Sequence, residues 1–194
     1  MSEHESKAHI LATATAVFAE KGFAKASMND IVRASGLSKG GVYWHFKSKD
    51  TLIAALFDQF FVGQLAMLDE VLASKGTAVA KIMQLAALSS TDVETMAAQF
   101  PSPLEFYALA AREDGLKSLL QTHFYNYQQK VSALVQQGIA NGEFHAVDSE
   151  AIAKAFIAIF EGALLLWAVS PELIDLSNDV ETAVRHLLQG LEAK

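Results

Sequence analysis

The 194-residue chain has no cysteine, which excludes a disulfide framework and a thiolate metal site. It has only three prolines, and all of them fall where the helical pattern already breaks. The longest apolar stretch, 155–169, is shorter than the roughly 20 residues of a membrane span, and Glu161 interrupts it. Since 52% of the residues are hydrophobic, a sizeable core can be buried. We therefore expect a soluble, cytoplasmic protein that does not contact a membrane.

Positive charge is scarce overall but concentrated near the N-terminus. The net charge is −7, yet residues 1–50 hold seven Lys and Arg against five Asp and Glu, and residues 51–194 hold eight against seventeen. Within 21–49 there are six basic residues and one acid, Asp30. A basic head on an acidic body can bind phosphate locally. An ordinary solvated charge cluster is an equally good interpretation of the charge alone.

Helical periodicity dominates the chain, and no stretch alternates as a strand would, so we predict an all-α fold. On the first helix, Ile10, Ala14 and Phe18 lie on one face. A possible break at 89–92 leaves open whether a helix continues toward Phe100. The predicted helices cover roughly 3–20, 28–35, 39–45, 49–72, 77–88, 104–111, 116–141, 149–169 and 178–191.

Two short helices follow the first one closely. Ser27, with Asp30 three residues later, caps one of them, and Gly36 ends it. Ser38 caps the next helix, which ends near His45. Two short helices joined by a glycine-containing turn of about four residues are typical of a helix-turn-helix, in which the second helix reads DNA. The pair alone is weak support, because many helical bundles contain one.

The second of these helices contains two adjacent glycines. Gly40 and Gly41 each cost about 1 kcal/mol relative to alanine inside a helix, which suggests a functional reason such as a close approach to DNA. Val42 and Phe46 lie one turn apart and can anchor this helix to the core. The alternative is a glycine loop followed by an aromatic core cluster.

The other side chains of this helix favour the functional interpretation. Lys39 can reach a guanine edge or a phosphate. Tyr43, Trp44 and His45 cannot all face inward, so at least one aromatic ring is left outside to contact DNA. Lys49, in the first turn of the next helix, can bind phosphate beside the helix amides, although a solvated lysine is the commoner outcome.

The stretch Ile10–Leu56 resembles the DNA-binding domain of the TetR family of repressors. The matching features are Phe18 with Gly22 and Phe23, Ile31, Ala34-Ser35-Gly36, and Val42-Tyr43-x-His45-Phe46-x-x-Lys49. This resemblance implies a homodimer that binds palindromic double-stranded DNA and is released by a small molecule. It also implies phosphate contacts from Ser27, Tyr43, His45 and Lys49 and base contacts near Lys39, Gly40 and Trp44. The full predicted DNA-binding set is Ser27, Met28, Ser38, Lys39, Gly40, Gly41, Tyr43, Trp44, His45 and Lys49. Other residues often occupy position 44 in the family, so the operator sequence does not carry over.

The predicted organisation has two parts, a helix-turn-helix domain at 1–48 and a helical ligand-binding and dimerisation domain at 49–194, connected by the helix 49–72. The helix 149–169 is apolar nearly all round and therefore needs cover on every side. A second copy of the chain can supply it, whereas the alternative is a central core helix in a monomer. The predicted dimerisation residues are Phe156, Phe160, Leu164, Val180, Val184, Leu187, Leu188 and Leu191.

The ligand pocket is less well marked. The candidates lie on the helices expected to surround it, and each is individually a plausible core residue: Phe60, Phe61, Met67, Met83, Phe100, Glu105, Phe106, Phe124, Tyr127 and Trp167. Glu105 or Glu161 can pair with a cationic ligand, although a cap or a salt bridge is the commoner role. His123 is expected to be an ordinary interior or surface histidine.

No cluster with metal-ligand spacing and no catalytic arrangement is apparent, so we expect neither a cofactor nor an enzyme. The leading hypothesis is a DNA-binding repressor released by a small apolar or aromatic ligand. The alternative is a helical small-molecule-binding protein without DNA-binding function. The basic cluster and the paired glycines favour the repressor, because a carrier needs neither.

Overall fold

The structure is a computed structural model that describes residues 2–99 and 103–193, with the backbone alone described at 90, 92–99 and 103. Within this part the predicted all-α fold is confirmed, and the extended backbone is limited to one isolated bridge between Phe144 and Glu192. The chain divides into two compact units. Unit 1 comprises Met1–Phe61 and Thr95–Leu119, and unit 2 comprises Val62–Glu94 and Leu120–Lys194.

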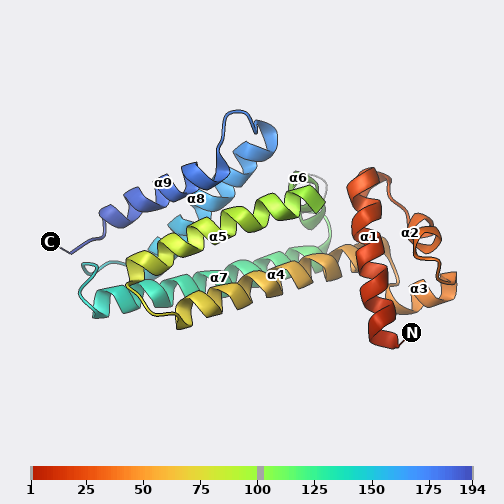
Figure 1. The fold of residues 1–194 in the computed structure, drawn as a ribbon, viewed down its shortest axis with the longest axis horizontal. Helices are drawn as coiled ribbons and strands as arrows, with labels where there is room; N and C mark the ends of the chain where they lie inside the picture. The colour runs from red at the N-terminus through yellow and green to blue at the C-terminus, as the bar shows by residue number, and fades with distance from the viewer. Residues whose placement is uncertain (1, 100–102, 194) are drawn as a thin grey trace. The chain divides into compact units, whose positions relative to one another are not determined.

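Unit 1 begins with three helices, α1 (Glu3–Lys25), α2 (Met28–Ser35) and α3 (Lys39–His45). In Figure 1, α1 and α2 lie next to each other and α3 follows at the end of a tight turn. Ile10, Ala14 and Phe18 are fully buried on α1, as the periodicity predicts. The unit also contains the start of α4 (Lys49–Ala73), α6 (Pro103–Ala110) and the first residues of α7 (Asp114–Ala140).

The ends of these helices follow the predicted capping residues. Gly22 breaks α1 at φ 75°, and Gly36 ends α2 at φ 66°, both in the left-handed region that suits glycine. Ser27 and Asp30 form a reciprocal capping box, in which each side chain accepts a hydrogen bond from the other residue's backbone N–H. The hydroxyl of Ser38 accepts a hydrogen bond from the Gly41 amide. The helix-turn-helix geometry therefore arises from local signals.

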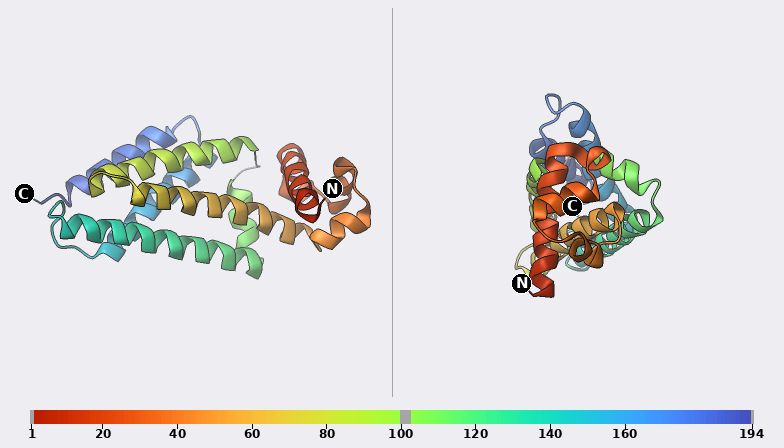
Figure 2. Two further views of the ribbon diagram at one scale, coloured as in Figure 1. Left: turned by 60° about the horizontal axis from the view of Figure 1, so that its bottom comes forward. Right: turned by 90° about the vertical axis from the view of Figure 1, so that its right-hand side faces the viewer.

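Unit 2 contains the rest of α4 and α7, most of α5 (Ala78–Gln99), α8 (Ser149–Val169) and α9 (Leu176–Gln189). Helices α8 and α9 lie side by side in both Figure 1 and Figure 2. Their inner faces share one core with α4, α5 and α7, including Leu68, Ile82 and Leu134.

The possible break at 89–92 is absent, because α5 continues through this segment. No glycine or proline interrupts that segment. The hydroxyl of Thr91 donates to the carbonyl of Ala87 one turn earlier, a bond that a helix accommodates.

Helices α4 and α8 are long and apolar enough to cross a membrane by length and composition alone, a test that core helices of soluble proteins also pass. Only 17% of the apolar window of α8 is buried within the chain. This helix therefore presents an apolar surface that the single chain leaves exposed.

Gly138 on α7 tests the packing of unit 2. A Cβ added there would lie 2.3 Å from Cδ2 of Phe144 and 2.9 Å from Cβ of Ala78. Gly138→Ala should therefore lower the free energy of unfolding by about 1–3 kcal/mol through overpacking. Gly63→Ala on α4, which meets no atom within 4 Å, should instead raise it by up to about 1 kcal/mol. Urea unfolding followed by circular dichroism measures both, and equal stabilities of the two variants would contradict the packing described.

Candidate nucleic-acid interface and cavity

One face of helix α3 packs against the rest of unit 1, and the other face is exposed. Val42 and Phe46 are buried, as predicted for the two anchors. Trp44 is 58% exposed, and its ring lies 4.7 Å from that of His45 in an edge-on arrangement. Lys39 is exposed, with its ammonium 5.7 Å from the centre of the half-buried Tyr43 ring. The prediction that an aromatic side chain of this helix is left outside is confirmed.

The paired glycines differ in their surroundings. A Cβ at Gly40 would meet no atom within 4 Å, whereas one at Gly41 would lie 3.3 Å from Oγ of Ser38. Packing within the chain therefore gives no reason for glycine at position 40. An approaching surface outside the chain would supply such a reason.

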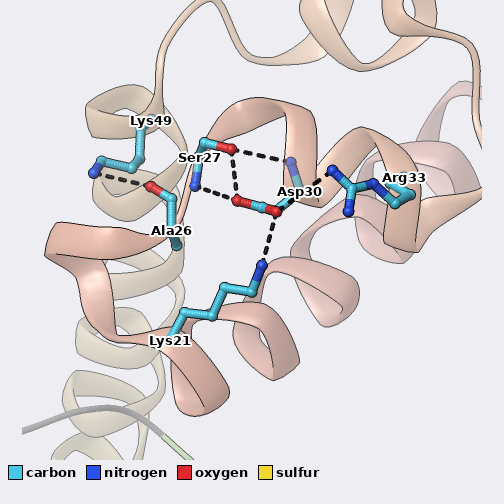
Figure 3. Close-up of polar contacts among 6 residues, drawn as sticks. All are labelled: Lys21, Ala26, Ser27, Asp30, Arg33 and Lys49. Carbon is cyan, nitrogen blue, oxygen red and sulfur yellow. Dashed lines mark hydrogen bonds and ion pairs between the residues drawn. The ribbon is translucent and has the colours of Figure 1, made fainter.

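The positive charge of the basic residues in 21–49 is partly neutralised by Asp30. Asp30 contacts Lys21 at 2.7 Å and Arg33 at 3.8 Å, as Figure 3 shows. Hydrogen bonds from Lys21, and then from Ser27, hold the pKa of Asp30 far below its usual range, so that it stays charged. Among the remaining basic residues of this stretch, Lys25, Lys39 and Lys47 have exposed side chains.

Two residues of the predicted DNA-binding set make contacts within unit 1. The hydroxyl of Ser27 donates to Asp30 at 2.6 Å and accepts from its backbone N–H at 3.2 Å. Met28 is only 9% exposed and packs inward, so its inclusion on the outer surface is corrected. It is the first residue of α2, and its side chain falls on the inner face with Ile31.

Lys49 has partners that the sequence interpretation did not include. Its ammonium donates to the carbonyl oxygens of Phe23 at 2.6 Å, Ala26 at 3.1 Å and Ala24 at 3.4 Å. Figure 3 shows the contact with Ala26. The break at Gly22 leaves these carbonyls without helical donors, and a lysine satisfies them. A phosphate contact from Lys49 remains a prediction.

Glu105 on α6 contacts the same segment of α1. Its Oε2 accepts a hydrogen bond from the backbone N–H of Phe23 at 2.9 Å. Its Oε1 lies 3.4 Å from the position that a Cβ of Gly22 would take. The next residue, Phe106, is buried and stacks on Phe57 with 3.6 Å between ring centres. Glu105 and Phe106 therefore serve the packing of unit 1, which corrects their predicted place in a pocket wall.

Two more predicted ligand residues, Phe60 and Phe61, also belong to unit 1. Phe61 is buried, with its ring 6.0 Å from that of Phe106. Phe60 lines a surface groove of about 580 Å³ between α1 and α4, together with Leu11 and Asp58.

A cavity of about 30 Å³ lies within unit 2. Two predicted ligand residues, Phe124 and Tyr127, line it. Phe156 and Phe160 line it as well, although the sequence suggested the dimer interface for both. The remaining lining residues are Gln64, Ser89, His123, Ile157 and Glu161.

The spacing of these residues was a usable signal that the sequence interpretation missed. His123 and Tyr127 on α7 are four residues apart, and so are Phe156 and Phe160 on α8. Such pairs share one helix face. Of the other predicted ligand residues, Met83 and Trp167 pack against the core, Met67 is half-buried, and Phe100 lies outside the described residues.

The predicted dimer surface also needs correction. Six of its eight residues are buried inside their own unit and offer nothing to a partner: Phe156, Leu164, Val180, Val184, Leu188 and Leu191. Leu187 is half-buried. The large apolar side chains that α8 exposes are Leu165, Leu166 and Val169.

Comparison with known families accounts for most of the chain. Residues 10–56 match the model of bacterial regulatory proteins of the tetR family, and residues 83–192 match the C-terminal domain of BetI-type transcriptional repressors. The second match covers more than half of the sequence. The chain belongs to the TetR family of transcriptional regulators.

Relatives of this TetR-family regulator extend over its full length. The HTH-type transcriptional regulator YfiR of Bacillus subtilis, itself uncharacterized, is 29% identical over 195 residues, covering 98% of this chain and 95% of its own. Two solved structures share the fold. SmeT of Stenotrophomonas maltophilia in complex with triclosan has a TM-score of 0.76 at 22% identity, covering 98% of this chain and 93% of its own. A protein from Saccharomonospora viridis in complex with choline has a TM-score of 0.82 at 15% identity, covering 98% and 100%.

The carbonyl contacts of Lys49 in this TetR-family regulator predict a stability effect. Lys49→Ala should lower the free energy of unfolding by about 1–3 kcal/mol, because three carbonyls lose a charged donor. Lys47→Ala, at an exposed neighbouring position, should change it by less than about 0.5 kcal/mol. Urea unfolding curves of the two variants give the comparison. If they coincide, the Lys49 ammonium is not committed to these carbonyls in solution.

Proposed function

We propose that this regulator is a repressor that binds a palindromic operator as a homodimer and leaves it when a small ligand enters unit 2. The observation that carries the DNA-binding part is the outer face of α3, where Lys39, Gly40 and Trp44 are exposed together. This is the second helix of the helix-turn-helix, whose N-terminal residues meet base edges in the major groove. The exposed Lys25 and Lys47 add positive charge for the phosphates.

Gly40 gives a test of DNA binding in which folding does not interfere. Gly40→Ala places a methyl group in open space and improves helix propensity, so the variant should fold at least as well. We expect it to bind DNA from upstream of its own gene at least about tenfold more weakly, because the backbone can no longer approach closely. Gly115→Ala, which also meets open space, is the matched control and should bind normally.

Gel shifts at several salt concentrations provide the measurement. Wild-type affinity should fall by orders of magnitude between about 50 and 200 mM salt if several phosphates are bound. Normal binding by Gly40→Ala would remove α3 as the reading helix. Salt-insensitive wild-type binding would count against DNA as the target.

The dimer part rests on the exposed face of α8. Leu165, Leu166 and Val169 are 52%, 54% and 66% exposed, on a helix whose apolar window is 17% buried. An exposed apolar face of this kind marks an interaction surface. A second copy is the simplest occupant, since a two-fold axis sets the same face against itself. Two heads spaced by about 34–36 Å would then enter successive major grooves of a palindrome.

Sedimentation tests this interface. Leu165→Asp should convert a micromolar dimer to a monomer without unfolding it, because the side chain is exposed in the single chain and would be buried without a counter-charge in the dimer. Val62→Asp, at a 59% exposed position of α4, is the control and should remain dimeric. A monomeric wild type, or a dimeric Leu165→Asp, would show that α8 is not the interface.

The ligand part rests on the cavity of unit 2. Related folds are known in complex with triclosan and with choline, which supports a small organic molecule as the effector here. Release requires that the ligand prefer the DNA-incompetent form, and DNA must then weaken ligand binding by the same factor.

A further inference from the structure

Helices α1 and α4 leave a groove between them, and every residue that lines it belongs to unit 1. Its volume of about 580 Å³ lies within the range of about 300–1,000 Å³ that is typical of sites for small organic molecules. Small side chains help to keep it open, because Ala8 and Ala12 on α1 and Ala55 on α4 line it. It shares no lining residue with the cavity of unit 2.

The groove offers an apolar surface to a ligand. Leu11 on α1 and Phe60 on α4 line it and are half-buried, and Leu56 lines it and is buried. The ring of Phe60 also packs against that of Phe61, with 5.7 Å between their centres. An apolar group that covers Leu11 and Phe60 removes their remaining surface from water, which favours binding in proportion to the area covered.

The two sides of the groove carry opposite charges. Lys7 lines it on α1 and Asp58 lines it on α4, and both residues are exposed. In the part of the chain that the structure describes, neither charge forms an ion pair with the other or with a third residue. The imidazole of His4 also lines the α1 side and can donate a hydrogen bond to a carboxylate. Unlike charges that share a groove without pairing leave space for a ligand between them.

This arrangement selects by charge as well as by shape. A carboxylate is attracted to Lys7 and repelled by Asp58, whereas an ammonium group behaves in the opposite way. A molecule with one charge therefore gains one attraction and meets one repulsion. A molecule with both charges gains both attractions, with its carboxylate toward α1 and its ammonium group toward α4.

We propose that the groove between α1 and α4 binds a small zwitterion with an apolar side group, such as an amino acid with a large apolar side chain. Lys7 holds the carboxylate, Asp58 holds the ammonium group, and the side group covers Leu11 and Phe60. Such a ligand bridges two helices of the unit that contains α3. The groove is thus a second ligand site, separate from the one proposed for unit 2.

Three compounds with the same fluorinated ring test the charge preference. 4-Fluoro-L-phenylalanine carries both charges, 3-(4-fluorophenyl)propanoate keeps only the carboxylate, and 2-(4-fluorophenyl)ethylamine keeps only the ammonium group. Exposed charges contribute modestly, so fluorine NMR of each compound with the full chain, which detects weak binding, is the measurement. The zwitterion should bind about threefold or more tightly than either relative. Equal or tighter binding of a compound with one charge would overturn the proposal.

Charge variants locate the two polar contacts. Lys7→Gln should weaken the zwitterion and the propanoate about twofold or more and strengthen the amine. Asp58→Asn should weaken the zwitterion and the amine and strengthen the propanoate. Lys117→Gln, at an exposed position of α7 in unit 1, is the control and should alter none of the three. A response to Lys7→Gln that is the same for all three compounds, or the same as that to Lys117→Gln, would overturn the proposal.

Two alanines of α1 test the location without removing a charge. Ala12→Leu places a larger side chain in the groove, whereas Ala16→Leu places it at an exposed position outside the lining. Leucine and alanine both favour a helix, so both variants should fold. Ala12→Leu should weaken the zwitterion about fivefold or more, and Ala16→Leu should leave its binding unchanged. Equal binding by the two variants would place the zwitterion elsewhere and overturn the proposal. None of these measurements uses DNA, so they test the groove independently of the repressor function.

Discussion

The arrangement of unit 1 depends on the backbone of one residue, Phe23. Its N–H donates to Glu105 on α6 and its carbonyl accepts from Lys49 on α4, so two helices hold the kink near the end of α1. Gly22 makes this possible, since its φ of 75° lies in the left-handed region that glycine adopts readily. Helices α2 and α3 follow this kink in the chain, so their direction depends on these two contacts.

The head and the cavity use charge in different ways. In the head, Asp30 organises Lys21 and Arg33 into a local network and leaves other lysines directed outward, so the exposed surface is positive although the chain as a whole is negative. The cavity of unit 2 is lined by Glu161 together with Phe124, Tyr127, Phe156 and Phe160. The exposed lysines of the head act on a charged partner over the distance of a screened electrostatic field. Glu161 acts only on a molecule inside the cavity.

Local chemistry made the first three helices predictable. Ser27 with Asp30, Gly36 and Ser38 mark helix ends. Each acts through residues no more than three positions away, and the structure places each as expected. The partners of Lys49 and Glu105 lie 23–26 and 82 residues away, and no local pattern encodes such pairings. The prediction of which residues of α8 face a partner was wrong for another reason. A helix that is apolar on every side carries no angular signal, so its sequence could not tell Phe160, facing the cavity, from Leu165, facing outward.

Unit 1 is assembled from two stretches of chain, Met1–Phe61 and Thr95–Leu119, with part of another unit encoded between them. A fragment that stops at residue 61 would lose Glu105 and Phe106 together. The amide of Phe23 would then lack its acceptor, and the ring of Phe57 would lose the partner stacked 3.6 Å away. Unit 1 is therefore not one continuous segment that can be transferred on its own to another protein. Its transfer to another protein by cutting and joining at a single point would carry over the helices but not the residues that hold their shared turn in place.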